Sequence, residues 1–241
     1  MKKDKIGVIG LGYIGLPLAV ELGKHYSVVG YDIDNNRVKN LQKGIDATNE
    51  IPRKKILSSK KIEFSNNLNL LKKCNIYIIA VPTPIYKNKT PNLSYLKKSI
   101  KLICNYLDRN NIVIFESTVY PGATEQYCVP LIEKYSKLKF NKDFFVGYCP
   151  ERINPGDKKN NIENINKIVS GSDKKTTIKI KNLYKTFIKA EVFMTSSIKV
   201  AEAAKILENT QRDINIAFMN EISIIFNKLN VDTSEVIQAA S

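Results

Sequence analysis

The sequence predicts an α/β fold in which a doubly wound, mainly parallel sheet is followed by one long α-helix that begins a separate helical part. Short apolar runs alternate with longer amphipathic runs between residues 5 and 193, which is the pattern of strand–helix–strand units around a parallel sheet. A glycine-rich turn follows the first apolar run directly. From residue 198 to residue 229 the chain has no Gly or Pro, and apolar residues recur at helical spacing.

Eight strands are expected, because each of the short runs is apolar and is bounded by polar or turn-forming residues. They are Lys5–Ile9, Ser27–Tyr31, Ile62–Phe64, Ile76–Ala80, Ile112–Phe115, Phe144–Gly147, Ile168–Ser170 and Ala190–Phe193. Helices are expected to begin near Tyr13, Asn35, Leu93, Ala123 and Lys174. The final helix is expected from Ile198 to Leu229, about 48 Å long at about 1.5 Å per residue, although two shorter helices with a bend would also fit the pattern.

The composition indicates a globular protein and argues against several classes of function. Hydrophobic residues make up 43% of the 241 residues and charged residues 25%, which is ordinary for a soluble domain. The net charge is +15, but the lysines are scattered as short pairs without interleaved aromatic residues, so a solvated surface is favoured over a nucleic-acid site. No apolar stretch is long enough to span a membrane.

The four cysteines have no C-x-x-C spacing, and His25 is the only histidine. A metal site or a disulfide framework is therefore not expected, and a reducing cytoplasm fits the composition.

The segment Gly10-Leu11-Gly12-Tyr13-Ile14-Gly15 has the G-x-G-x-x-G spacing and lies between the first strand and the first helix. In that context Gly10 allows a tight turn, Gly12 allows close approach of a pyrophosphate, and Gly15 allows close helix–strand packing. Asp32 ends the second strand, where a carboxylate would accept the ribose hydroxyls and repel a 2′-phosphate. The sequence therefore predicts a Rossmann-type site for NAD rather than NADP, with Arg37 on the adenine side.

Three polar, proline-containing segments follow predicted strands, at residues 80–84, 116–122 and 148–156. Because ligands bind at the carboxyl ends of strands in open α/β sheets, these segments are expected to form the walls of a site. On the long helix, Lys205, Asn209 and Arg212 fall within about 60° of one face. This face suits a ligand that carries or develops negative charge, although a solvated polar stripe would look the same.

These segments together resemble the UDP-glucose/GDP-mannose dehydrogenase family, and most nearly its UDP-N-acetylglucosamine/UDP-N-acetylgalactosamine 6-dehydrogenase branch. The resemblance runs from end to end and is carried by Gly10–Gly15, Val81–Ile85, Glu116–Thr124, Gly147–Asp157 and Ser197–Asn220. The branch is indicated by Pro82–Ile85 and by Arg152–Gly156. Cys149 stands where the branch usually has Ser.

The resemblance implies an NAD-dependent enzyme that oxidises C6 of a UDP-N-acetylhexosamine to the uronic acid in two hydride transfers, for surface polysaccharide precursors. It implies roles for individual residues as follows. Tyr13, Ile14, Asp32, Arg37, Thr83 and Thr118 would contact NAD, with Thr118 near the reacting carbon. Glu151, Arg152 and Ile153 would lie along the substrate, and Glu151 would handle a proton. Lys205 would hold the developing oxyanion with help from Asn209, and Arg212 would contact the substrate.

The resemblance also implies a domain organisation. We expect an NAD-binding domain at residues 1–196, and at residues 197–241 a connecting helix that begins a central helical domain and forms a homodimer. The family places its nucleophilic cysteine in a Gly-Gly-His-Cys segment beyond the long helix, followed by a UDP-binding domain, and neither has a counterpart before Ser241. The chain is therefore expected to be a fragment or a shortened product that binds NAD and oxidises feebly at most.

Two other classes remain open at the level of sequence. A β-hydroxyacid dehydrogenase would also join a Rossmann-type domain to a long helix bearing Lys-x-x-x-Asn, although the Pro150-Glu151-Arg152 segment speaks against it. A non-catalytic module that binds NAD and dimerises through the long helix is the third possibility.

Overall fold

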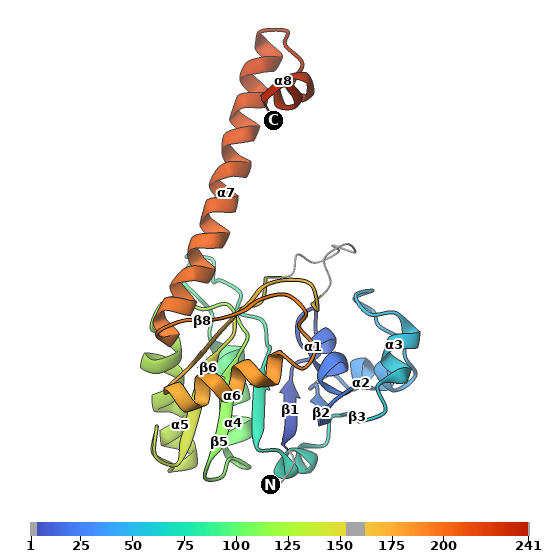
Figure 1. Cartoon of the computed structure of the whole chain (residues 1–241), viewed down its shortest axis with the longest axis vertical. Coiled ribbons are helices and arrows are strands. Elements are labelled where there is room, and N and C mark those ends of the chain that lie inside the picture. The colour runs from blue at the N-terminus through green and yellow to red at the C-terminus, as the bar shows by residue number, and fades with distance from the viewer. Residues whose placement is uncertain (1–3, 153–161, 241) are drawn as a thin grey trace. The chain divides into compact units, whose positions relative to one another are not determined.

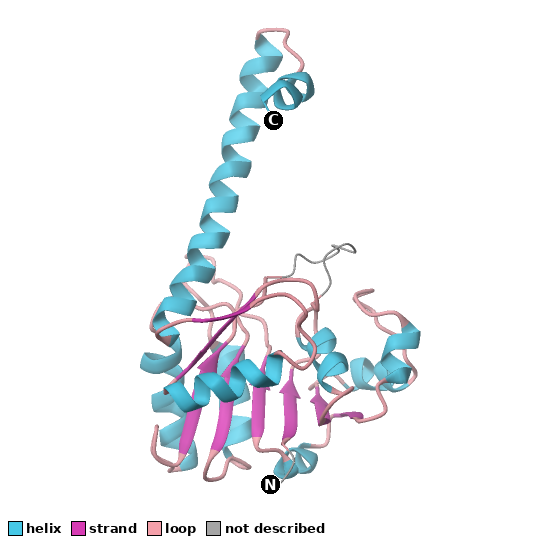
Figure 2. Cartoon of the chain, in the orientation of Figure 1, coloured by secondary structure: helices cyan, strands magenta, loops and turns pink. Residues whose placement is uncertain are grey.

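The computed structural model describes residues 4–152 and 162–240, and its first compact unit, residues 1–202, is built around an eight-stranded sheet (Figures 1 and 2). The strands are β1 (Lys5–Ile9), β2 (Ser27–Tyr31), β3 (Ile62–Ser65), β4 (Ile76–Ile79), β5 (Asn111–Phe115), β6 (Phe144–Tyr148), β7 (Lys167–Gly171) and β8 (Val192–Met194). Their order is β3-β2-β1-β4-β5-β6-β7-β8, and neighbours among these strands are parallel except for β6 and β7. The strand order reverses between β1 and β4, which confirms the predicted doubly wound, mainly parallel sheet.

Helices cover both faces of the sheet and create two separate cores. On one face pack α1 (Gly15–Leu22), α2 (Asn35–Gln42), α3 (Arg53–Ser58) and α6 (Lys174–Tyr184). On the other face pack η1 (Leu68–Lys73), α4 (Ser94–Cys104), η2 (Thr124–Cys128) and α5 (Val129–Ser136). Alternate residues of β4 enter the two cores, with Ile78 on the α1 side and Tyr77 on the α4 side. Because both faces are buried, the central strands are continuously apolar.

The predicted elements correspond closely to the observed ones, with a few differences. All eight strands are present, and β1 and β2 have the predicted bounds. The helix expected near Ala123 begins instead with a π-helical segment, η2, and Pro130 stands at the start of the α-helix that follows it. Since Pro130 has no N–H to donate to the preceding turn, the regular α-helical ladder cannot extend through this point. The short helices α3, η1 and α8 (Thr233–Ala240) were not expected.

The second compact unit consists of residues 203–241 and contains most of α7 (Ile198–Lys228) and all of α8. The long helix α7 is one unbroken element of 31 residues, so the alternative of two bent helices is wrong. At about 1.5 Å per residue it is about 47 Å long. Asn230 has a positive φ of 55° in the turn that follows, and the Asp232 carboxylate accepts hydrogen bonds from the backbone N–H groups of Ser234 and Glu235 at the start of α8.

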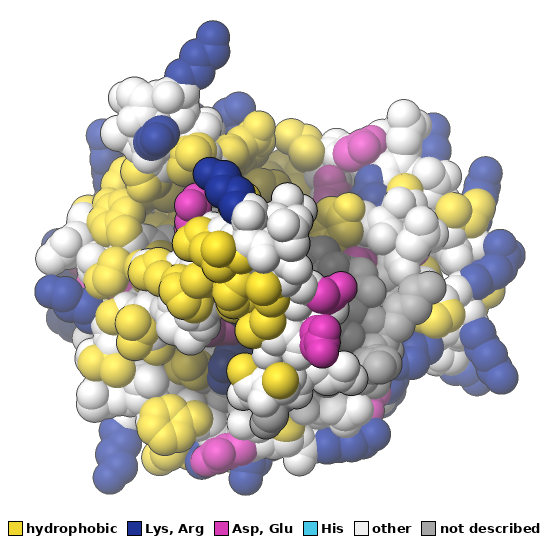
Figure 3. Space-filling model, turned by 90° about the horizontal axis from the view of Figure 1, so that it is seen from above, with side chains coloured by type: hydrophobic (Ala, Val, Ile, Leu, Met, Phe, Trp, Pro, Cys, Tyr) yellow, Lys and Arg dark blue, Asp and Glu magenta, His cyan; other side chains and the backbone are white. Residues whose placement is uncertain are grey.

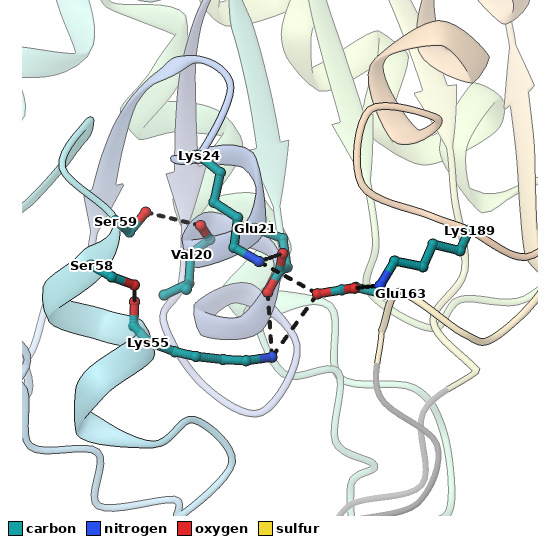
Figure 4. Close-up of polar contacts among 8 residues, drawn as sticks. All are labelled: Val20, Glu21, Lys24, Lys55, Ser58, Ser59, Glu163 and Lys189. Carbon is teal, nitrogen blue, oxygen red and sulfur yellow. Dashed lines mark hydrogen bonds and ion pairs between the residues drawn. The ribbon is translucent and has the colours of Figure 1, made fainter.

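An ionic network joins α1, α3 and the segment that leads into β7 (Figure 4). The buried Glu21 carboxylate pairs with Lys24, and its other oxygen lies 3.8 Å from Nζ of Lys55. Glu163 lies 3.4 Å from Lys24 and 2.6 Å from Lys189. The hydrogen bond from Lys189 lowers the pKa of the Glu163 carboxyl group. The network therefore ties residue 163 to the helices beside β1 in the first unit.

The basic side chains form no continuous field on the face shown in Figure 3. Lys and Arg side chains occur there as separate groups, with hydrophobic and neutral surface between them. Across residues 4–152 and 162–240, no helix has both the length and the apolar character needed to cross a membrane.

Candidate functional site

A cavity of about 540 Å³ lies at the carboxyl ends of β1, β2 and β4, where the strand order reverses. Its walls are Ile9–Ile14, Tyr31–Ile33, Ala80–Pro82 and four residues of α4, namely Tyr95, Lys98, Ser99 and Leu102. Open α/β sheets bind their ligands at this position, because the loops diverge there and leave a crevice. The glycine-rich segment and Asp32, both predicted from the sequence, line the same cavity.

The three glycines of the turn have the distinct environments that dinucleotide binding requires. Gly10 has a φ of 91°, and a Cβ atom there would lie 2.8 Å from the carbonyl oxygen of Ala80. A Cβ atom on Gly15 would lie 1.8 Å from the carbonyl oxygen of Gly10, so the turn packs directly on the start of α1. A Cβ atom on Gly12 would meet no protein atom within 4 Å. Gly12 therefore borders open space at the helix start, where a pyrophosphate would bind to free N–H groups.

Asp32 is oriented by two backbone hydrogen bonds. Its Oδ2 accepts a hydrogen bond from the N–H of Leu11 at 2.8 Å, and its Oδ1 accepts one from the N–H of Asp34 at 3.0 Å. Both donors lie next to the cavity or in the following turn, so the carboxylate is fixed at the cavity edge while it keeps lone pairs for further acceptance. This is the arrangement that suits the two hydroxyl groups of an adenosine ribose.

Arg37 fixes the glycine-rich segment from the other side. Its Nε and one terminal nitrogen donate to the carbonyl oxygen of Leu11 at 2.9 and 2.7 Å, and its other terminal nitrogen donates to Asp46 at 2.7 Å. The backbone of Leu11 is therefore held on both sides, at its N–H by Asp32 and at its carbonyl group by Arg37. The position of Arg37 on the adenine side of the site, expected from the sequence, stays a prediction.

Hydrogen bonds join the loops that follow β4 and β5. The Thr83 hydroxyl donates to the carbonyl oxygen of Thr118 at 2.7 Å, and the Ser117 hydroxyl donates to the carbonyl oxygen of Val81 at 2.6 Å. Thr83 and Thr118, which the resemblance implies as NAD contacts, are therefore brought together beside the cavity wall formed by Val81 and Pro82.

Glu151 follows β6 and is buried against Lys167 of β7. Its Oε2 lies 3.0 Å from Nζ of Lys167, and its Oε1 accepts a hydrogen bond from the N–H of Arg152 at 2.7 Å. Lys167 also donates to Oε2 of Glu116, which follows β5, at 2.7 Å. Ile153, the third predicted substrate residue of this segment, lies outside the described residues.

Sequence analysis did not identify Lys167 or Glu202 as site residues. The predicted strand began at Ile168, so Lys167 lay outside it, whereas Lys167 begins β7 and its side chain is buried. Glu202, in the first turns of α7, is also buried and accepts hydrogen bonds from the N–H groups of Gly122 and Thr124 at 2.5 and 2.8 Å. It thereby caps the segment that follows Thr118. The sequence offered one indication of their burial, namely that Lys167 and Glu202 are charged residues next to apolar ones.

In the second unit, the uninterrupted helix α7 keeps Lys205, Asn209 and Arg212 on one face, as their spacing predicts. Glu208 lies between them and pairs with both cations, at 3.4 Å from Nζ of Lys205 and at 2.5 Å from Arg212. The face is therefore a cation–carboxylate–cation row rather than an isolated pair of positive charges. Glu208 was not among the residues predicted from the sequence.

All four cysteines are buried and unpaired. Burial raises the pKa of Cys74, Cys104 and Cys128 to about 12 and raises that of Cys149 as well. Since the thiolate is the reactive form, these thiols are poor nucleophiles at neutral pH. No cluster of metal-ligating side chains occurs within residues 4–152 and 162–240.

The fold and the cavity define a class: an α/β protein that binds a dinucleotide across the strand-order reversal, with the phosphates at the start of α1. Comparison with known proteins identifies the family. Residues 4–188 match the UDP-glucose/GDP-mannose dehydrogenase family, NAD binding domain, and residues 199–241 match the central domain of the same family. The chain belongs to the UDP-glucose/GDP-mannose dehydrogenase family, and the prediction of NAD as cofactor is confirmed.

Individual relatives agree with this assignment. The chain is 52% identical over 240 residues to a UDP-N-acetyl-D-glucosamine 6-dehydrogenase of Pseudomonas aeruginosa, which covers 100% of the chain and 57% of the relative. It is 52% identical over 235 residues to Protein CapL of Staphylococcus aureus, covering 98% of the chain and 55% of that protein. The chain therefore spans little more than half the length of these relatives.

Solved structures share the fold. The UDP-D-ManNAc dehydrogenase of Pyrococcus horikoshii superimposes with a TM-score of 0.89 at 36% identity, over 98% of this chain and 57% of that one. A ternary complex of GDP-mannose dehydrogenase from Pseudomonas aeruginosa gives a TM-score of 0.88 at 24% identity, over 97% and 56% of the two chains, and supports the fold alone.

Proposed function

We propose that the chain is the cofactor-binding and central-helix part of an NAD-dependent nucleotide-sugar dehydrogenase. The substrate we propose is a UDP-N-acetylhexosamine, whose C6 hydroxyl group is oxidised to a carboxylate in two hydride transfers, and the product would serve surface polysaccharide synthesis. The relatives of this chain that are named UDP-N-acetyl-D-glucosamine 6-dehydrogenase support this substrate class. NAD, when bound, supplies the hydride acceptor.

One observation carries the proposal. The dinucleotide cavity, the paired loops bearing Thr83 and Thr118, and the buried Glu151 follow the neighbouring strands β4, β5 and β6 at the same edge of the sheet. A cofactor that lies across β1 and β4 would extend its reactive end toward this edge. The chain thereby offers hydroxyl and carboxylate groups where an alcohol would be oxidised.

The roles of the residues follow from their chemistry and remain part of the proposal. Gly10, Gly12, Gly15, Tyr13, Ile14, Asp32 and Arg37 form the NAD site, with Thr83 and Thr118 toward the nicotinamide. Glu151, Arg152 and Ile153 contact the substrate. Lys205 and Asn209 stabilise the oxyanion that develops at C6, because fixed donors and positive charge lower the energy of that state, and Arg212 binds the substrate.

Activity on nucleotide sugars tests the proposal. In the full-length gene product, NADH formation measured over a panel of UDP-N-acetylhexosamines should reach two equivalents per sugar oxidised. One equivalent per substrate, with small hydroxy acids accepted, would identify the β-hydroxyacid dehydrogenase class instead. Tight NAD binding without turnover of any UDP-sugar would identify a non-catalytic module.

We also propose a homodimer formed through α7. Four exposed apolar residues of α7 and the one that follows it have heptad-like spacing and form one stripe, namely Leu207, Ile214, Phe218, Ile225 and Leu229. The exposed residues Ile216 and Ile224 lie outside this stripe, and the exposed Val200 belongs to the first unit. The stripe lies about 180° around the helix from Lys205 and Asn209. An exposed stripe with this repeat, on a helix too long to be covered by its own short hairpin with α8, suits a second copy of the same helix.

Light scattering on the chain tests the dimer. Glu substitutions at Phe218 and Ile225 should convert a dimer into a monomer, whereas Asn227→Glu on the opposite face should not. A monomeric wild-type chain and a monomeric full-length protein would together disprove the dimer.

We further propose that the two domains divide between residues 196 and 197. We also propose that the protein acts in the cytoplasm, where four unpaired thiols would stay reduced.

A further inference from the structure

Four titratable side chains from separate elements of the first unit, Glu151 among them, meet in a buried cluster. Lys167 begins β7, Glu116 follows β5, Glu151 follows β6, and Tyr184 ends α6. Their exposed fractions are 3%, 0%, 6% and 0% respectively. We call these four residues the Lys167 cluster.

The contacts in the Lys167 cluster are those of a shared ammonium group. Nζ of Lys167 donates to Oε2 of Glu116 at 2.7 Å and to Oε2 of Glu151 at 3.0 Å. The Tyr184 hydroxyl donates to the other oxygen of Glu116, and the Lys167 ammonium lies 5.4 Å from the centre of the Tyr184 ring. One positive charge therefore serves two carboxylates, while the phenol and its ring give further support to the charged groups.

The two carboxylates of the cluster differ in how they are stabilised. Glu116 is completely buried, and burial raises its pKa to about 7 although the Lys167 ammonium opposes the shift. Glu151 accepts hydrogen bonds at both oxygens, from Lys167 and from the backbone N–H of Arg152. Donors at both oxygens favour the ionised form of a carboxyl group. Burial therefore favours the neutral form of Glu116, whereas the donors at both oxygens favour the ionised form of Glu151.

Stability alone is a weak reason for such a cluster. Replacing a buried ion pair or triad by well-packed apolar side chains is often neutral or stabilising, because the pair must compensate the desolvation of its charges. Here two carboxylates and one ammonium lie at the edge of the sheet that the proposed substrate would occupy. Two further titratable neighbours in the described part of this unit are Cys149 and Tyr148, which precede Glu151 in sequence, and both are neutral because burial raises the pKa of the thiol and of the phenol.

We propose that Lys167 is a positioning residue for Glu151: held by Glu116 and Tyr184, its buried ammonium keeps the Glu151 carboxylate ionised and fixed beyond β6, so that Glu151 acts as an acceptor toward the substrate hydroxyl. This inference rests on the proposed dehydrogenase function. It assigns Lys167, Glu116 and Tyr184 to the support of the site rather than to contact with substrate or cofactor.

The protonation state of Glu151 can be measured without any activity. In the wild-type 241-residue chain, ¹³C NMR of the Glu carboxyl carbons, assigned with Glu116→Gln and Glu151→Gln, should show Glu151 ionised from pH 8 down to about pH 5. The Glu116 resonance should titrate near neutral pH in the same spectra. A Glu151 carboxyl group that is protonated at pH 6 would overturn the inference.

Kinetics of the full-length protein then isolate the effect of the ammonium. In Glu116→Gln the Lys167 ammonium still donates to Glu151, whereas Glu116→Gln/Lys167→Met removes that ammonium. The acid limb of the pH profile of kcat/KM should lie at least about one pH unit higher in the double variant than in Glu116→Gln. Glu116→Gln/Lys167→Arg should restore it to within about half a unit, because Arg remains charged.

The outcomes distinguish the inference from the function on which it rests. Coincident acid limbs for Glu116→Gln and Glu116→Gln/Lys167→Met, with NAD affinity intact, would refute the positioning role of Lys167. If the double variant does not fold, the NMR measurement on the wild-type chain decides. A wild-type full-length protein that oxidises no UDP-sugar would refute the proposed function, while the NMR result would still report whether Lys167 holds Glu151 ionised.

Discussion

Replacement of Asp32 by Ala tests the cofactor site at its most sensitive point. The carboxylate lies at the cavity edge, where the two ribose hydroxyls of NAD would donate to it. In the free protein it also accepts the N–H of Leu11 and the N–H of Asp34. The substitution therefore removes the predicted ribose contacts and one of the two groups that hold the Leu11 peptide.

The expected loss follows from the charge of the acceptor. Hydrogen bonds to a charged group contribute about 1.5–3 kcal/mol, so the NAD dissociation constant should rise by about 10- to 150-fold at 25 °C. Asp32→Asn keeps an oxygen for the Leu11 N–H and loses only the charge, so it should lie between wild type and Asp32→Ala. Isothermal titration calorimetry on the 241-residue chain measures all three dissociation constants.

Asp34→Ala is the matched control. Asp34 caps α2 by accepting hydrogen bonds from the N–H groups of Asn36 and Arg37 and does not line the cavity. The change should lower the free energy of unfolding by about 1 kcal/mol and leave NAD affinity unchanged. Equal NAD affinity in wild type and Asp32→Ala would show that the carboxylate does not bind the ribose, and the assignment of the cavity would have to be abandoned.

Four further substitutions test other residues of the chain. Gly15→Ala should lower the free energy of unfolding by about 1–3 kcal/mol or more, because its Cβ would lie 1.8 Å from a backbone oxygen. Gly12→Ala should instead leave the free energy of unfolding in urea nearly unchanged and weaken NAD binding at least about tenfold, since its Cβ occupies open space in the cavity. Equal losses of stability in Gly15→Ala and Gly12→Ala would contradict the separate roles of the two glycines. Glu202→Ala should cost about 1–3 kcal/mol for each of the two buried N–H groups it leaves unpaired, measured by urea unfolding, and a wild-type midpoint would disprove this capping role. Lys205→Ala in the full-length protein should lower kcat about a hundredfold or more with NAD affinity retained, and wild-type turnover would remove Lys205 from the mechanism.

The sequence predicted the parts of the fold that are marked by local patterns. Strands β1 and β2 are short apolar runs with polar residues at both ends, and they were predicted with their observed bounds. The glycine spacing was informative because its context between a strand and a helix was also visible. The short helix α3 was missed, since six residues are too few to show a helical period and three of them are basic.

The features that sequence analysis missed depend on contacts between distant segments. The partners of Lys167 lie 16 and 51 positions earlier in the chain, and only the adjacency of β5, β6 and β7 brings them together. The antiparallel orientation of β7 was likewise invisible, because an isolated apolar run carries no direction. Arg37 was expected on the adenine side of the NAD site, whereas its hydrogen bonds to Leu11 could be identified only from the structure.

The contact between Arg37 and Asp46 links the turn at residues 46–51 to the glycine-rich segment. Asp46 accepts hydrogen bonds from the Thr48 hydroxyl, from the backbone N–H groups of Thr48 and Ile51 and from Arg37, and although burial opposes the shift, these bonds lower the pKa of the Asp46 carboxyl group. Any ligand that tightens the peptide of Leu11 also restrains Arg37 and, through it, the turn at residues 46–51. Amide hydrogen exchange of that turn would therefore slow when a dinucleotide binds. The exchange rate would report the fraction of protein with bound dinucleotide without any attached label.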